Sequence, residues 1–169
     1  GRLPIAGPPL AALFMLWIAG RVAVLFSAST GPALATALDI GFFLTLAALA
    51  AREVLAAKNR NLPIVVLVLL FGAANAADHA AAAGWLADEG IGIRAAISLV
   101  VLMISLIGGR IVPSFTRNWL AKQGIKDRLP GQPVRYDIAT IAATALALLA
   151  WLTAPASPVA GVMLVGAGL

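Results

Sequence analysis

Apolar residues fill six stretches of the sequence, and short polar segments separate them. A run of about 20 apolar residues is long enough to cross the hydrocarbon core of a bilayer as an α-helix. A segment surrounded by lipid satisfies its backbone hydrogen bonds only as a helix, so no strand is expected. The pattern therefore predicts an all-α, polytopic transmembrane bundle. Its about six membrane segments are 9–26, 33–51, 62–83, 93–112, 136–153 and a short last one that begins at Ser157.

The last apolar stretch is shorter than the others. As an α-helix, Ser157 to Leu169 would cover about 20 Å, whereas the hydrocarbon core is about 30 Å thick. We therefore expect this segment to be truncated, and the chain to be a fragment of a longer polytopic protein whose remaining transmembrane helices pack against it.

Composition supports a membrane protein, because 62% of the residues are hydrophobic and only 11% are charged. A soluble domain carries about 25% charged residues. The prediction is a single transmembrane domain over residues 1–169. Cysteine is absent, which excludes disulfides, thiolate metal sites and redox thiols.

Basic residues gather in the segments that would lie on one side of the membrane. Asp88 and Glu89 occupy a loop on the opposite side, where Arg94 is the one basic residue. The excess of Lys and Arg marks the cytoplasmic side, so this distribution sets the orientation and gives no reason to expect a nucleic-acid partner. The residues predicted to be cytoplasmic are Arg2, Arg52, Lys58, Arg60, Arg110, Arg117, Lys122, Lys126, Arg128 and Arg135.

A mixed segment follows the fourth apolar stretch. Pro113 precedes it, Trp119 and basic residues lie within it, and Gly124 can cap it. We predict a cytoplasmic interfacial helix and loop over residues 113–130, although the same side chains can serve only to anchor the neighbouring spans. Gly108 and Gly109 are interpreted as a place of close helix approach rather than as a ligand contact.

Ionisable residues inside the spans give the best candidate site, because each costs several kcal/mol unless it is paired or faces a polar cavity. Arg21 and Asp39 lie at similar depth in neighbouring antiparallel spans. They fit either a structural ion pair or a site where Arg21 holds an anion. Asn75, Asp78 and His79 share the spacing of one helix face. All five are predicted to converge in one polar pocket in the outer half of the bundle.

His79 is the one conventional nitrogen ligand for a metal or haem in the sequence, and the Asp78 carboxylate is able to take a metal or a proton. A lone His near a helix end is also commonly a structural, hydrogen-bonded residue. With no second His and no Cys, a site with several ligands needs residues from outside the chain. The sequence assigns no catalytic residue.

One block of sequence suggests a family. It reads Gly108-Gly109-Arg110-Ile111-Val112-Pro113-Ser114-Phe115-Thr116-Arg117-Asn118-Trp119-Leu120-Ala121. Asn59-Arg60-Asn61-Leu62-Pro63 at the start of a span, Asn75 and His79 within it, and the initial Gly1-Arg2-Leu3-Pro4 occur in the matching order. Together they resemble the NnrS family of bacterial membrane proteins over nearly the whole chain.

The resemblance implies a haem- and copper-associated protein of the bacterial inner membrane that takes part in the nitric oxide response and in protection from nitrosative stress. It implies that Asn75 and His79 bind a cofactor and that His79 binds metal, whereas the predicted metal role of Asp78 rests on its carboxylate. Family members are longer and carry further His-containing spans. Arg110 and Arg117 would suit haem propionates, but their predicted distance from His79 is about 20 Å or more, which favours a structural or interfacial role. A transporter-like or scaffolding domain with a proton or anion path and no cofactor is the alternative.

Overall fold

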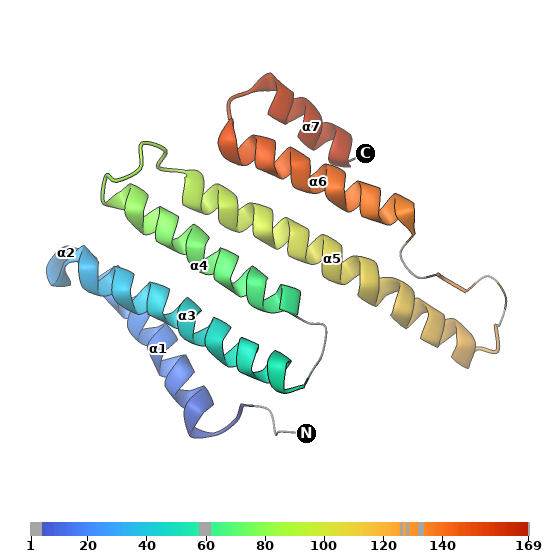
Figure 1. The fold of residues 1–169 in the computed structure, drawn as a ribbon, viewed down its shortest axis with the longest axis horizontal. Coiled ribbons are helices and arrows are strands. Elements are labelled where there is room, and N and C mark those ends of the chain that lie inside the picture. Colours follow the sequence, from blue (N-terminus) through green and yellow to red (C-terminus); the bar gives the residue numbers. More distant parts are fainter. Residues whose placement is uncertain (1–4, 58–61, 126, 128, 132–133, 169) are drawn as a thin grey trace. The chain divides into compact units, whose positions relative to one another are not determined.

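The computed structural model describes residues 5–57, 62–125, 127, 129–131 and 134–168, and Figure 1 shows the path of the chain. All regular elements in these residues are helices, as the apolar pattern predicted. The side chain of Arg110 lies outside the described part. So do Arg2, Lys58, Arg60, Lys126 and Arg128, whose predicted cytoplasmic location stays a prediction.

Five of the helices are long and apolar enough to cross a membrane, namely α1, α3, α4, α5 and α6. The short apolar helix α7 has 11 residues. The bounds are α1 Pro8–Leu25, α2 Ser27–Thr30, α3 Pro32–Ala56, α4 Leu62–Ala82, α5 Ile91–Lys122, α6 Arg135–Thr153 and α7 Pro158–Gly168. These helices confirm the polytopic helical prediction.

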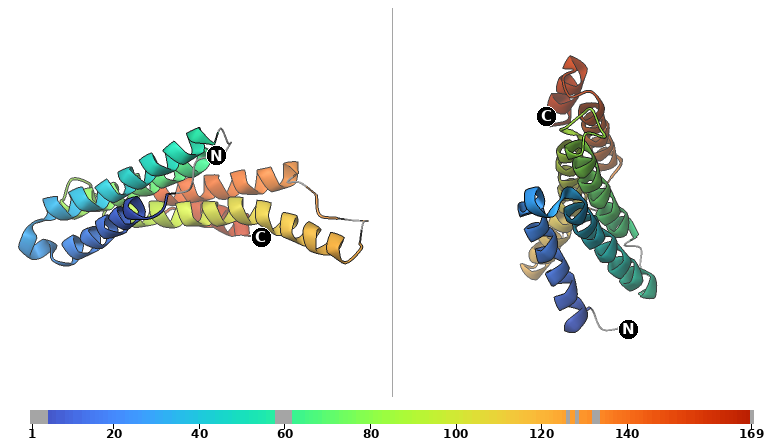
Figure 2. Two further views of the ribbon diagram at one scale, coloured as in Figure 1. Left: turned by 90° about the horizontal axis from the view of Figure 1, so that it is seen from below. Right: turned by 90° about the vertical axis from the view of Figure 1, so that its left-hand side faces the viewer.

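The chain divides into two compact units, residues 1–96 and residues 97–169. In the first unit α3 packs against α1 on one side and α4 on the other, and the two views of Figure 2 show these helices side by side. In the second unit α6 packs against α7. The single transmembrane domain predicted from the sequence remains a prediction.

Glycine and proline define how the first helices begin. Gly7 and Gly31 have φ values of 64° and 87°, and a proline occupies the first turn of the helix that follows each of them. Positive φ is easily adopted only by glycine, and proline is preset for a helix start. The sequence predicted an irregular turn between the first two spans, but residues 27–30 form the single helical turn α2.

Small residues allow the helices of the first unit to approach closely. Its buried apolar side chains are mainly alanine: Ala23, Ala35, Ala47, Val65, Ala74 and Ala81. A Cβ atom added to Gly72 of α4 would lie 2.9 Å from the Cβ of Phe43 on α3. Such small residues are typical of helix contacts inside membranes, and they bring α1 and α4 close to the polar side chains of α3.

Helix α5 continues through Pro113 and ends only at Lys122. The separate interfacial helix expected after Pro113 is therefore the last part of α5, because a proline removes one backbone hydrogen bond without stopping the rest of the helix. Gly124, with a φ of 79°, ends the helix as predicted, and the N–H of Ile125 donates to the carbonyl of Leu120 at 3.1 Å. The 32 residues of α5 cover about 48 Å, more than a hydrocarbon core of about 30 Å.

Candidate functional site

Asp39, on α3, is the centre of the candidate site. It is only 3% exposed, although it lies within a helix that is apolar enough to cross a membrane. A carboxylate in such a place is costly unless other side chains donate hydrogen bonds or positive charge to it. Three donors from two neighbouring helices do so, and they surround both of its oxygen atoms.

The first donor is Arg21 of α1, whose Nη2 forms an ion pair with Oδ1 of Asp39. The pair predicted from the similar depth of the two residues is therefore present. A Cβ atom on the neighbouring Gly20 would lie 3.3 Å from the same oxygen, so glycine lets α1 come close to the carboxylate. The Arg21 side chain is 47% exposed and has further N–H groups that this single contact does not use.

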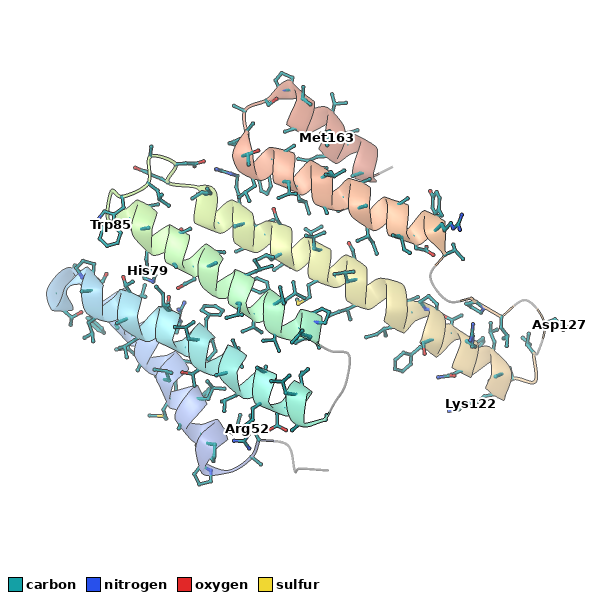
Figure 3. The ribbon with its side chains drawn as sticks, in the orientation of Figure 1. Arg52, His79, Trp85, Lys122, Asp127 and Met163 are labelled. Carbon is teal, nitrogen blue, oxygen red and sulfur yellow. The ribbon has the colours of Figure 1, made fainter. Side chains whose placement is uncertain are left out.

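The other two donors come from α4. The amide Nδ2 of Asn75 donates to Oδ2 of Asp39 at 2.9 Å, and Nε2 of His79 lies 3.2 Å from the same oxygen. Residues four apart project from the same side of a helix, which is why both reach one atom. Figure 3 labels His79 near the end of α4 that leads to Trp85. The cluster of Arg21, Asp39, Asn75 and His79 is called the Asp39 cluster below.

The Asp39 cluster determines which nitrogen of His79 carries a proton. An Asp39 side chain that is paired with Arg21 is ionised and can only accept hydrogen bonds. The Nε2 atom of His79 must therefore be the N–H donor, which in the neutral ring leaves the lone pair on Nδ1. Within the described residues Nδ1 forms no hydrogen bond, and the side chain is 18% exposed.

One polar atom of the cluster lacks a partner. Oδ1 of Asn75 is buried and accepts no hydrogen bond from the described residues, while Nδ2 of the same amide donates to Asp39. A buried acceptor of this kind normally binds a water molecule or another ligand. The cluster therefore has an unused acceptor on the same face of α4 as His79.

Asp78 does not join the Asp39 cluster, so the prediction that all five polar residues converge is wrong for this residue. Its side chain is exposed, and a Cβ atom on Gly92 of α5 would lie 2.6 Å from its Cβ. Consecutive residues of a helix differ by about 100° in direction, so Asp78 points away from the face that His79 shares with Asn75. Asp78 instead lies against the start of α5, and its predicted metal role stays untested.

The glycines of the sequence block lie in open surroundings. A Cβ atom on Gly108 or Gly109 would meet no described atom within 4 Å, and the close helix approach predicted there stays a prediction. Asn118 and Trp119, later in the block, are exposed on the last part of α5. Their predicted position at the membrane surface remains a prediction.

Arg117 has a specific partner that sequence reasoning missed. Its Nε donates to the backbone carbonyl of Pro130 at 2.9 Å, and its Nη2 donates to the same oxygen. The guanidinium therefore holds the loop after α5 against the helix. A contact with a backbone carbonyl 13 residues away leaves no signal in side-chain patterns, so the sequence alone did not indicate it.

The loop between α4 and α5 contains a second ion pair that the sequence did not predict. Arg94 binds Oδ2 of Asp88, while the N–H of Gly90 donates to Oδ1 at 3.1 Å. The hydrogen bond from Arg94 is the largest cause that lowers the pKa of Asp88 below its ordinary value. The sequence did contain a signal for this pair, because the two opposite charges are six residues apart with Gly90 between them.

Comparison with known proteins supports the resemblance that the sequence suggested. Residues 1–169 match the family described as NnrS protein. No curated protein and no solved structure gives a significant match. The matched region contains the complete Asp39 cluster and the block around Gly108. The chain therefore belongs to the NnrS family.

Proposed function

We propose that this chain forms part of a membrane protein of the nitric oxide response that protects bacteria from nitrosative stress. The family match over residues 1–169 carries the proposal. Its apolar helices support a multi-pass membrane protein. The inner membrane of a bacterium is the location that we propose, with the basic segments in the cytoplasm.

The family resemblance associates the protein with haem and copper. Haem does not fit the Asp39 cluster. Nε2, the usual axial ligand atom of a His, is bound to Asp39, and Arg117 is bound to the carbonyl of Pro130 rather than free for a propionate. We therefore assign no haem-dependent step to these residues.

The cluster offers copper a single candidate ligand atom, because neutral imidazole nitrogen is among the ligands that copper prefers. His79 would contribute that nitrogen, and further ligands would have to come from other parts of the protein. The described residues contain no group of three or more His, Cys, Asp or Glu side chains that could hold a metal by itself. A bound copper ion would supply one-electron chemistry, while Asp39 would orient the imidazole.

The proposed role in the nitric oxide response is tested by growth. A strain without the gene should grow poorly with a nitric oxide donor, and the wild-type gene should restore growth. Asp39→Asn should fail to restore growth because it weakens the hold on Arg21 and His79. Asp127→Asn, in an exposed loop, is the matched control and should restore it fully. Normal growth of the deletion strain under the donor would contradict the proposal.

A proton or anion path without a cofactor is the second candidate, and the ionic character of the Asp39 cluster favours it. Arg21 and His79 bind the same buried carboxylate from different helices, as in sites where protons or anions cross membranes. The test is flux measured with a pH-sensitive dye inside proteoliposomes. This function requires flux that is lost with Asp39→Asn, and wild-type vesicles as impermeable as empty ones would exclude it.

A further inference from the structure

We propose that the loop between α4 and α5 is a membrane-binding element, in which Trp85 and Leu86 insert into the lipid headgroup layer and hold α4 at a fixed depth. The partner of this surface is the bilayer itself. The proposal does not depend on the role in the nitric oxide response, because it rests on the loop alone.

The position of the loop makes lipid headgroups its surroundings. Residues 83–90 join α4 and α5, which are both long and apolar enough to cross a membrane. The 21 residues of α4 cover about 32 Å, close to the thickness of a hydrocarbon core of about 30 Å. The loop that follows α4 therefore lies where hydrocarbon meets water, whichever side of the membrane it faces.

Trp85 presents a large apolar surface at this level, and Figure 3 labels it next to the end of α4. Trp85 is 81% exposed and the neighbouring Leu86 is 38% exposed. An indole ring that faces water gains nothing from the hydrophobic effect. At headgroup depth, in contrast, its apolar body contacts acyl chains while its N–H donates to water or lipid, which is why tryptophan is enriched there.

The ion pair of the loop is compatible with insertion. Asp88 and Glu89 are the charged residues of segment 83–90. Arg94 binds the carboxylate of Asp88, and the N–H of Gly90 donates to Oδ1 of the same residue at 3.1 Å. This pairing neutralises Asp88, so Trp85 and Leu86 can enter the headgroup layer without bringing an isolated Asp88 charge toward the lipid.

The backbone connects Trp85 firmly to α4. Gly84 has a φ of 76°, and the N–H of Trp85 donates to the carbonyl of Ala80 at 2.9 Å. A glycine that ends a helix in this way ties the next residue to the last helical turn. His79 is three residues from the end of the same helix, about 5 Å along its axis. Because interfacial aromatic residues help to set how a helix sits in the bilayer, Trp85 also fixes the depth of the Asp39 cluster.

Tryptophan fluorescence of the protein in liposomes tests the insertion. Trp17→Phe, Trp119→Phe and Trp151→Phe together leave Trp85 as the one tryptophan of the chain. We expect its emission to be quenched most by lipids brominated near the headgroup, and less by lipids brominated near the chain ends. Quenching by iodide in the water with none by brominated lipid would overturn the proposal. So would emission that neither quencher reaches, because protein rather than lipid would then cover Trp85.

A spin label measures the effect on the depth of α4. The chain has no Cys, so Ala83→Cys, at an exposed position, provides a single labelling site. Oxygen collects in lipid and a nickel chelate stays in water, so the ratio of their collision rates with the label reports its depth. Adding Trp85→Ala should shift this ratio toward water, because Asp88 and Glu89 then draw the loop outward. Trp119→Ala, on the last part of α5, is the control and should leave the ratio unchanged. An unchanged ratio in Trp85→Ala would contradict the anchoring role.

Discussion

Each of the two units of the chain is stabilised internally by a different kind of contact. In residues 1–96, charged and polar side chains from three helices meet at Asp39. In residues 97–169, α6 and α7 bury mainly small or aliphatic side chains, among them Ala147, Leu148 and Ala160. Thr140, Thr144 and Thr153 of α6 each donate to a backbone carbonyl of their own helix.

This difference indicates where chemistry can occur. A hydroxyl that is bonded to its own helix stabilises that helix and is not available to a ligand. A buried carboxylate with donors from neighbouring helices links those helices and fixes the orientation of every donor. The first unit therefore has the features of a functional centre, and the second unit those of a structural helix pair. The predictions below test this division.

The largest effect is expected for Asp39→Ala. Removing one partner of a buried ion pair lowers the free energy of unfolding by about 3 to 5 kcal/mol. Because the Arg21 side chain is 47% exposed and partly solvated, we expect a loss of about 3 kcal/mol. Thermal or denaturant unfolding in detergent, followed by tryptophan fluorescence, measures it. Asp127→Ala is the control, with no change expected. Equal stability of the two variants would show that the Asp39 cluster does not hold the first unit together.

Glycine substitutions compare packing in the two units. In Gly92→Ala the new Cβ would lie 2.6 Å from the backbone nitrogen of Asp78 and 2.8 Å from the carbonyl of Ala74, and we expect a loss of about 1 to 3 kcal/mol. Gly161→Ala in α7 meets no atom within 4 Å and should stabilise the protein by up to about 1 kcal/mol. Changes of opposite sign in the free energy of unfolding of the two variants would support the difference in packing. A stabilising Gly92→Ala would refute the close contact between α4 and α5.

Arg117→Gln tests whether a polar contact in the second unit has only a structural role. Loss of its bonds to the carbonyl of Pro130 should cost about 1 kcal/mol and speed hydrogen exchange in the loop between α5 and α6. Copper content should not change. Lys122→Gln removes a neighbouring positive charge and serves as the control. A loss of copper in Arg117→Gln would mean that the functional centre extends into the second unit.

The smallest effect concerns pH and the loop between α4 and α5. Because Arg94 lowers the pKa of Asp88, the carboxylate stabilises the folded loop above the ordinary value of 3.8 and loses this contribution as the pH falls through the lowered value. A carboxyl titration followed by NMR should have its midpoint below 3.8. Arg94→Gln should move the midpoint upward, and a wild-type midpoint above 3.8 would disprove the pairing.

Much of the fold follows directly from the sequence. Lipid requires each long apolar run to be a helix, so α1, α3, α4 and α6 lie close to their predicted positions. The pair of Arg21 and Asp39 was predictable because two opposite charges at the same depth in neighbouring spans rarely remain apart. The shared helix face of Asn75 and His79 was predictable because the two residues are four positions apart on one helix.

Other features depend on geometry that sequence patterns do not contain. Asp78 was grouped with His79, yet one step along a helix turns a side chain by about 100° and directs it toward Gly92. Pro113 was expected to end a helix, but α5 continues through it as far as Lys122. The tautomer of His79 required the positions of three other side chains, which no spacing specifies.

The most direct test of the central claim is the ¹⁵N NMR spectrum of histidine-labelled protein, in which the His79 signals are identified by their loss in His79→Gln. The two nitrogen shifts report which atom carries the proton. We predict a proton on Nε2 in the wild type and a mixture of the two tautomers in Asp39→Ala. A proton on Nδ1 in the wild type, or a spectrum that is the same in Asp39→Ala, would contradict the assignment of Asp39 as the residue that orients His79.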